Sequence, residues 1–136
     1  MKYKFAAPLL VILVACTSHR LPFRGGLFRG TPPGTELELS CAESGSCEGS
    51  VRFESGDLAK ALGTARHSLC RAAMVDRHLE FSFERDPHGG CSAMLDPVQG
   101  SFDDDFGVLR GSMHWERTQK DFPVTLRIAK PHGKKR

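Results

Sequence analysis

Apolar and polar residues alternate along five short segments of the chain, and this period of two is the feature that most constrains its fold. Successive side chains of a strand point to opposite faces, so each segment is predicted to form a strand with one buried and one solvent-facing side. A further short run, residues 91–95, is a sixth strand candidate after a turn at 86–90. The five alternating segments are residues 37–41, 51–54, 79–84, 109–115 and 122–128.

Residues 57–73 show a helical pattern instead. Five apolar residues recur there at alternating steps of four and three, which places them on one face of a helix. Ser55 or Asp57 can cap its start. The resulting order, ββαββββ, predicts a small α+β domain with a mostly antiparallel sheet that is covered by one helix. The five residues are Leu58, Leu62, Ala65, Leu69 and Ala72.

The N-terminus has the layout of a signal peptide. Lys2 and Lys4 precede the uncharged, mostly apolar run 5–15, and the small residue Ala15 precedes Cys16. As a helix this run would be about 16 Å long, whereas a bilayer core needs about 30 Å. The segment is therefore predicted to direct export and not to span a membrane.

The sequence Leu13-Val14-Ala15-Cys16 resembles the lipobox of bacterial lipoproteins. The resemblance implies a diacylglyceryl group on the Cys16 thiol, cleavage before Cys16, and acylation of the new amine, for instance by palmitate. It implies an envelope protein whose membrane partner is lipid, bound through Cys16. Thr17 and Ser18 follow in place of an aspartate, which for a Gram-negative lipoprotein implies the outer membrane and a domain facing the periplasm. The resemblance covers residues 1–16, and the rest of the chain resembles no family known to us.

Composition divides the chain into four parts. Residues 1–15 are the predicted signal peptide, and residues 16–34 are the lipidated cysteine with a flexible Gly/Pro/Arg-rich tether. Residues 35–130 are predicted to form the single globular domain, and residues 131–136 a basic tail.

Charge favours no nucleic-acid partner. The full chain has 19 Lys and Arg residues against 16 Asp and Glu. Cleavage removes Lys2 and Lys4 and leaves an excess of one positive charge, which is too small for a nucleic-acid-binding surface.

Four cysteines remain after Cys16: Cys41, Cys47, Cys70 and Cys91. An exported chain meets an oxidising compartment, so an even number predicts two disulfides. Four cysteines allow three pairings, and we favour Cys41–Cys47 with Cys70–Cys91. The first pair would clamp a hairpin around a short polar loop, and the second would tie the helix to a later strand.

Histidines and cysteines raise the question of a metal site or a nucleophile. His88 and Cys91 lie on one turn, and His78, His114 and Cys70 complete an imaginable ligand set, but no spacing requires a metal site. A Cys–His nucleophile would leave an unpaired cysteine. We therefore predict neither a metal nor a cofactor.

Carboxylates offer two further possibilities. Asp103, Asp104 and Asp105, with Asp96 nearby, have oxygen ligands for calcium, but consecutive aspartates cannot all point inward, so we expect a solvated loop over 96–106. Acid–base pairs are conceivable among the glutamates on the polar faces of strands, where carboxylates are normally solvated. These are Glu36, Glu38 and Glu54, and Glu80 with Glu84.

These observations favour a non-enzymatic envelope lipoprotein with a small disulfide-braced domain that binds a protein or another envelope component. The alternatives are a small periplasmic enzyme that uses His88 or His114, and an inhibitor that displays a loop on a disulfide scaffold. No catalytic residue is assigned. The sequence leaves the ligand, the partner and the oligomeric state open.

Overall fold

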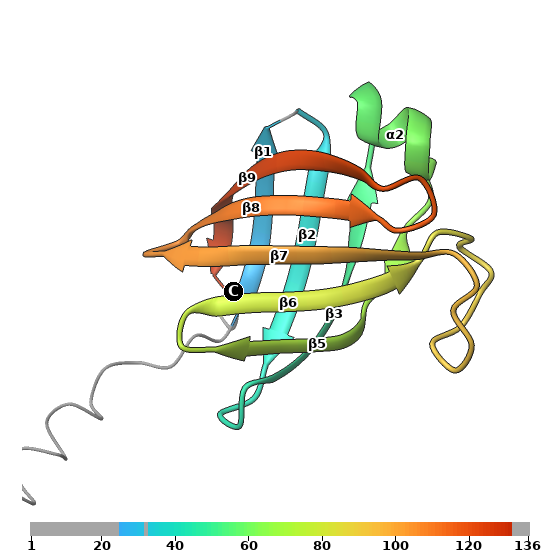
Figure 1. Ribbon diagram of the computed structural model, residues 1–136. Helices are drawn as coiled ribbons and strands as arrows, with labels where there is room; N and C mark the ends of the chain where they lie inside the picture. Colours follow the sequence, from blue (N-terminus) through green and yellow to red (C-terminus); the bar gives the residue numbers. More distant parts are fainter. Residues whose placement is uncertain (1–24, 32, 132–136) are drawn as a thin grey trace, which may run out of the picture.

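A computed structural model describes residues 25–31 and 33–131 (Figure 1). Nearly all regular structure in this part of the chain is β-strand, and one short helix, α2, spans Gly56–Leu62. The strands are β1 Gly25–Thr31, β2 Thr35–Cys41, β3 Ser46–Phe53, β4 His67–Ser68, β5 Cys70–Val75, β6 His78–Glu84, β7 Pro97–Asp105, β8 Val108–Trp115 and β9 Lys120–Pro131.

The strands form a closed antiparallel barrel of eight strands, with the two-residue β4 added beside β3. Each long strand pairs with the next long strand along the chain, and β9 returns to pair with β1. The prediction of an α+β domain with a helix-covered sheet is therefore wrong. Closure gives both edges of the sheet a partner, so the barrel has no free edge for a helix to protect.

The predicted helix over 57–73 is the main cause of that error. Helix α2 ends at Leu62, because Gly63 follows with a φ of 85°, and Ala65 is exposed. Beyond it, Cys70, Ala72 and Met74 are buried at a period of two, and this segment is strand β5. The apolar residues of 57–73 fit the spacing of a helix by coincidence. From Cys70 onward the residues follow the period of two of a strand instead.

Two further strands occupy segments that were predicted to be irregular. Residues 25–31, predicted as tether, form β1, and the Phe28 side chain is fully buried. Residues 97–105, predicted as loop, form β7, which buries Val98 and Phe102. In each strand glycine stands where the alternation would place an apolar side chain. The strand predicted at 91–95 does not form, since this segment lies in the loop between β6 and β7.

The barrel interior is filled by side chains. Leu58 and Leu62 of α2 are buried in the same core, so the helix covers one end of the barrel and not a face of a sheet. The Phe81 ring lies over Gly100 on the neighbouring strand, where a Cβ atom would come within 2.3 Å of the ring. Core residues from the strands include Phe28, Leu37, Val51, Phe53, Leu79, Phe83, Phe102, Leu109, Met113 and Leu126.

The structure contains both disulfides in the favoured pairing. Cys41–Cys47 joins directly paired positions of β2 and β3 beside their hairpin turn. Cys70–Cys91 joins the start of β5 to the long β6–β7 loop, whereas the sequence predicted a link from helix to strand.

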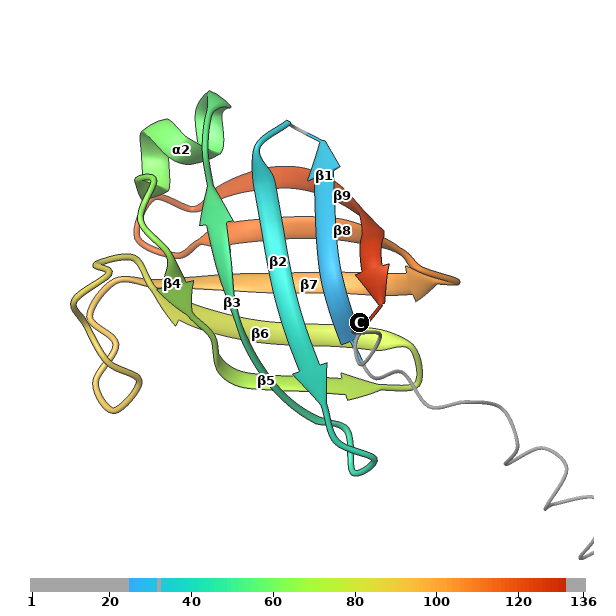
Figure 2. The same cartoon turned by 180° about the vertical axis from the view of Figure 1, so that it is seen from behind.

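The two ends of the barrel differ in construction (Figures 1 and 2). We call the end that carries α2 and the loop 85–96 the helix end. The opposite end, where β1 begins, is called the Gly25 end. It carries the β5–β6 turn at 76–77, the β7–β8 turn at 106–107 and the last residues of β9.

Candidate functional site

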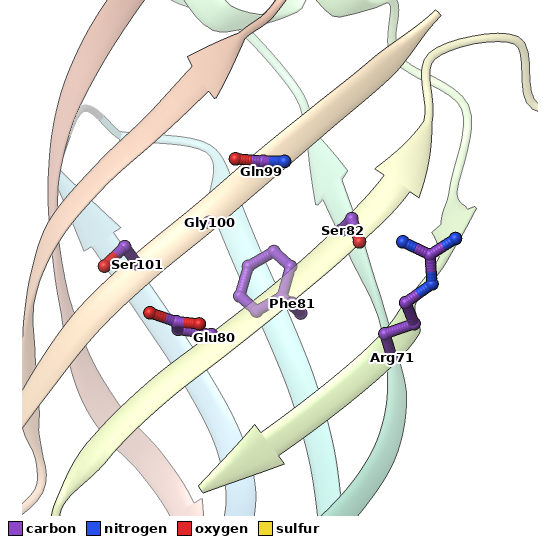
Figure 3. A pocket seen from close by; sticks show the side chains of 7 residues that line it. All are labelled: Arg71, Glu80, Phe81, Ser82, Gln99, Gly100 and Ser101. Atoms are coloured by element: carbon purple, nitrogen blue, oxygen red, sulfur yellow. The ribbon is translucent and has the colours of Figure 1, made fainter. Parts of the chain in front are cut away.

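A polar depression of about 380 Å³ lies on the outer wall of the barrel over β5, β6 and β7 (Figure 3). We call it the outer pocket. Its polar side chains project outward from three neighbouring strands, and its floor is formed by Phe81 and Gly100. The lining residues are Arg71, Glu80, Phe81, Ser82, Gln99, Gly100 and Ser101.

Strand register brings these residues together. Glu80 is paired with Ser101, and Ser82 with Gln99, so the four side chains form two adjacent cross-strand pairs on one face. The two serines are short and lie among longer side chains, which leaves the surface hollow between them. Ser82 donates a hydrogen bond to the carbonyl oxygen of Cys70, 3.4 Å away.

Arg71 occupies a β-bulge in β5. The β5–β6 register shifts between Cys70 and Ala73, and Arg71 has a φ of 54°, in the left-handed region. A non-glycine residue there costs about 1–2 kcal/mol, and bulges commonly re-aim a side chain next to a functional site. The Cys70–Cys91 disulfide lies directly beside this bulge. Among the described residues, the Arg71 guanidinium has no hydrogen bond or ion pair.

His78 lies at the rim of the outer pocket. Its Nδ1 atom is 2.8 Å from Oδ1 of Asp103, and its Nε2 atom is 3.0 Å from Oε2 of Glu80 and 3.2 Å from Oγ of Ser101. Hydrogen bonds to Asp103 and then to Glu80 raise the pKa of His78 above its usual value. The imidazole thus lies between two carboxylates that favour its charged form.

The contacts from Ser101 to His78 to Asp103 have the connectivity of a hydrolase triad. A general base must accept the serine proton at Nε2, but Glu80 competes for that atom and the raised pKa favours imidazolium. The backbone N–H groups of β6 and β7 are engaged in the strand ladder, so these two strands offer no backbone pair to stabilise an oxyanion. We therefore assign this cluster an electrostatic role at the pocket rim.

The residues predicted for chemistry lie apart from one another. His88 is exposed in the loop at the helix end, where its backbone N–H donates to Asp86. His114 lies on β8, with its Nδ1 atom 2.7 Å from Oδ1 of Asp121. Cys70 and Cys91 are bonded to each other, so neither is a free thiol in this structure. Cys16 lies outside the described residues.

The predicted carboxylate groupings also separate. Asp103, Asp104 and Asp105 end β7 near the Gly25 end, whereas Asp96 lies at the helix end and accepts a hydrogen bond from Trp115. Within residues 25–31 and 33–131, no group of three or more His, Cys, Asp or Glu residues is placed to hold a metal ion. No helix in that part of the chain is long and apolar enough to cross a membrane.

Two glutamates differ from the solvated state predicted for them. Glu36 lies between the guanidinium groups of Arg29 and Arg52, and its hydrogen bond to Arg52 is the main cause of its lowered pKa. Glu84 is only 8% exposed and accepts a hydrogen bond from the backbone N–H of Asp96 at 3.1 Å. Both roles stabilise the fold.

Sequence reasoning missed the outer pocket because it placed Arg71 in a helix and Gln99 and Ser101 in a loop. The signal available in the sequence was the apolar alternation of Cys70, Ala72 and Met74, together with Val98 and Phe102 four residues apart around Gly100. We compared the chain with protein-family models, curated proteins and solved structures, and none of them matched.

Proposed function

We propose that the chain is a lipid-anchored protein of the bacterial envelope that acts by binding rather than by catalysis. Its ligand site is the outer pocket, and the ligand is a small polar molecule or terminal group that carries a carboxylate. Cys16 is the point of lipid attachment, as the lipobox resemblance implies, with the outer membrane as the expected location.

The observation that carries the ligand assignment is the state of Arg71. Its backbone is held in a costly conformation, and its guanidinium has no partner among the described residues. A guanidinium presents a planar fork of N–H donors that matches a carboxylate. Ser82, Gln99 and Ser101 add hydroxyl and amide groups, and Glu80 can accept from a ligand ammonium or hydroxyl group.

Anchoring is tested by Cys16→Ser. The variant should escape cleavage by the lipoprotein peptidase and remain without acyl chains, which mass spectrometry of the purified chain measures directly. A normally cut and acylated Cys16→Ser product would refute the lipid anchor.

Ligand binding is tested by NMR titration of the isotopically labelled chain with solubilised cell-wall fragments, which carry carboxylate, hydroxyl and ammonium groups. Shifts should concentrate at residues 71, 80–82 and 99–101. Arg71→Gln should weaken binding by about 10- to 100-fold, since a charge-assisted hydrogen bond contributes about 1.5–3 kcal/mol. Arg66→Gln is the matched control, because Arg66 is an exposed arginine that hydrogen-bonds to Ser50. Equal affinity of both variants would place the ligand elsewhere.

A further inference from the structure

Two neighbouring turns at the Gly25 end expose large apolar side chains. Phe106, in the β7–β8 turn, is 86% exposed, and Val75, beside the β5–β6 turn, is 63% exposed. Arg77 links the turns, since its Nε atom donates to the carbonyl oxygen of Asp104 at 3.3 Å. Its guanidinium lies over the Phe106 ring at 4.5 Å. We call Val75, Arg77 and Phe106 the hairpin tip.

Turn chemistry does not explain these residues. Phe106 has a φ of 51° and Arg77 a φ of 65°, both in the left-handed region. Two-residue hairpin turns of this kind favour asparagine, aspartate or glycine, and a bulky residue there costs about 1–2 kcal/mol. A phenylalanine that is both strained and exposed adds nothing to the core, and its contact with the Arg77 guanidinium lies at the exposed surface. Its presence indicates contact with something outside the barrel.

The chain enters and leaves the barrel at this same end. Strand β1 begins at Gly25, and nine residue steps from Cys16 extend at most roughly 30 Å. Gly26 pairs with Pro131 at the end of β9, after which the sequence continues with Lys134, Lys135 and Arg136. A membrane that holds Cys16 therefore lies within roughly 30 Å of the Gly25 end.

Two of the four acidic residues beside the tip have basic partners, whereas Asp104 accepts a hydrogen bond from the backbone N–H of Gly107 and Asp76 is exposed in the β5–β6 turn. Asp103 contacts His78, and Asp105 lies 3.3 Å from Arg110 and 3.9 Å from Arg77. The negative charge of these two residues is thus locally compensated. The tip itself combines an aromatic ring, an aliphatic side chain and a guanidinium, which suits the boundary between lipid headgroups and acyl chains.

We infer that the hairpin tip docks on the lipid surface to which Cys16 is attached, with Phe106 and Val75 in the acyl boundary and Arg77 at the headgroup phosphates. This inference rests on the proposed lipid anchor. It fixes the orientation of the barrel: the helix end points away from the bilayer, and the outer pocket lies on the side wall.

The test uses the full acylated chain in vesicles of phosphatidylethanolamine and phosphatidylglycerol with brominated acyl chains, which quench tryptophan on contact. Phe106→Trp is compared with Leu95→Trp, because Leu95 is 84% exposed and belongs to the helix end. The native Trp115 provides the baseline in both proteins. We expect several-fold stronger quenching and a blue shift for Phe106→Trp only. Equal quenching of the two variants, or none in either, overturns the inference.

Mass spectrometry and vesicle flotation separate this result from a failure of the anchor. A chain without acyl groups that does not float refutes the anchor, and the docking with it. An acylated chain that floats without quenching at position 106 refutes docking alone, and leaves a protein as the partner of the tip. Phe106→Asn suits the turn and should keep the fold while it removes protection of the 104–108 amides from hydrogen exchange on vesicles.

Discussion

The two ends of the barrel distribute their polar and apolar groups in opposite ways. At the helix end, Leu62 is buried, and its carbonyl oxygen lies 3.1 Å from Nε2 of the buried His67. The other ring nitrogen of His67 is 3.1 Å from the carbonyl oxygen of Glu84. At the Gly25 end, Phe106 and Val75 are exposed on turns. The helix end buries hydrogen-bonded polar groups, and its exposed Leu95 lies in a loop, whereas the Gly25 end exposes Phe106 in a turn with a positive φ.

Further contacts reinforce the helix end. Arg85 donates to the carbonyl oxygen of Ala61 at 2.7 Å and lies over the Trp115 ring, whose N–H donates to Asp96 at 2.7 Å. These interactions join the helix, the β6–β7 loop and β8. We therefore expect stability to be concentrated at the helix end, which would leave the Gly25 end free to carry strained residues.

The largest effect is expected from Leu62→Ala. Leu62 is 2% exposed, and truncating a buried leucine costs about 2–5 kcal/mol. Val75→Ala at the Gly25 end should change stability by less than about 0.5 kcal/mol, because Val75 is largely exposed. Urea unfolding of both variants measures the contrast. Similar losses at the two positions would show that the ends contribute equally.

The disulfides give the second contrast, since Cys70–Cys91 braces the helix end and Cys41–Cys47 the Gly25 end. The sequence separations are 21 and 6. Loop-closure entropy alone makes the longer link more stabilising by about 1 kcal/mol, and Cys41 and Cys47 are already opposed by β2–β3 pairing. Double Cys→Ala variants should be unfolded under identical conditions. The Cys70/Cys91 variant should have the lower free energy of unfolding. A less stable Cys41/Cys47 variant would reverse the expected order.

Acid should weaken the helix end first. Burial lowers the pKa of His67, so its neutral form is favoured in the fold. Its contribution is complete above the ordinary value of 6.5, and it is lost as the pH falls from there through the lowered folded-state pKa. Stability measured between neutral and mildly acidic pH should therefore fall. His67→Gln should be less stable at neutral pH but show a smaller fall.

The contribution of His78 to stability depends on pH in the opposite direction to that of His67, so His78 serves as the control. Its pKa is raised, so its contribution is present at acidic pH and is lost as the pH rises through the folded-state value. His78 is 39% exposed, so solvent screening keeps this contribution small. His78→Gln should retain the loss of stability in acid. If the stability of His78→Gln did not change with pH, the loss of stability in acid would come from His78 and not from His67.

The smallest effect is expected from Phe106→Asn. Asparagine tolerates a φ of 51° better than phenylalanine does, so stability should stay equal or rise by up to about 1 kcal/mol. Thermal unfolding in the absence of lipid measures this change. A clear destabilisation would mean that Phe106 supports the fold, which would weaken its assignment to an external contact.

Sequence patterns predicted much of the barrel wall but not its closure. The segments 37–41, 79–84, 109–115 and 122–128 lie within observed strands, and the segment 51–54 overlaps β3, which ends at Phe53. They succeed because each has one buried and one exposed face, which alternation reports directly. The two disulfide pairs are also as favoured.

The failures have a common physical cause. In β1 and β7, Gly30 and Gly100 leave room for close neighbours: a Cβ atom on Gly30 would meet backbone of β9, and one on Gly100 would meet the Phe81 ring. Glycine has no side chain, so it adds nothing to the hydropathy alternation. The close packing at Gly30 and Gly100 therefore cannot be read from the sequence pattern. Arg71 was missed similarly, since a bulge depends on the partner strand and not on local sequence.

Barrel closure through β1 and β9 has a consequence for how the chain folds. All other pairings of long strands join neighbours along the sequence, but this one joins residues 26–31 to residues 125–131. The hairpins can form locally, whereas the pairing of β1 with β9 cannot form until β9 has been synthesised. A product that stops before Lys120 would expose β1 and β8 as unpaired edges, which recruit other chains. Early termination should therefore yield aggregates rather than a smaller folded protein.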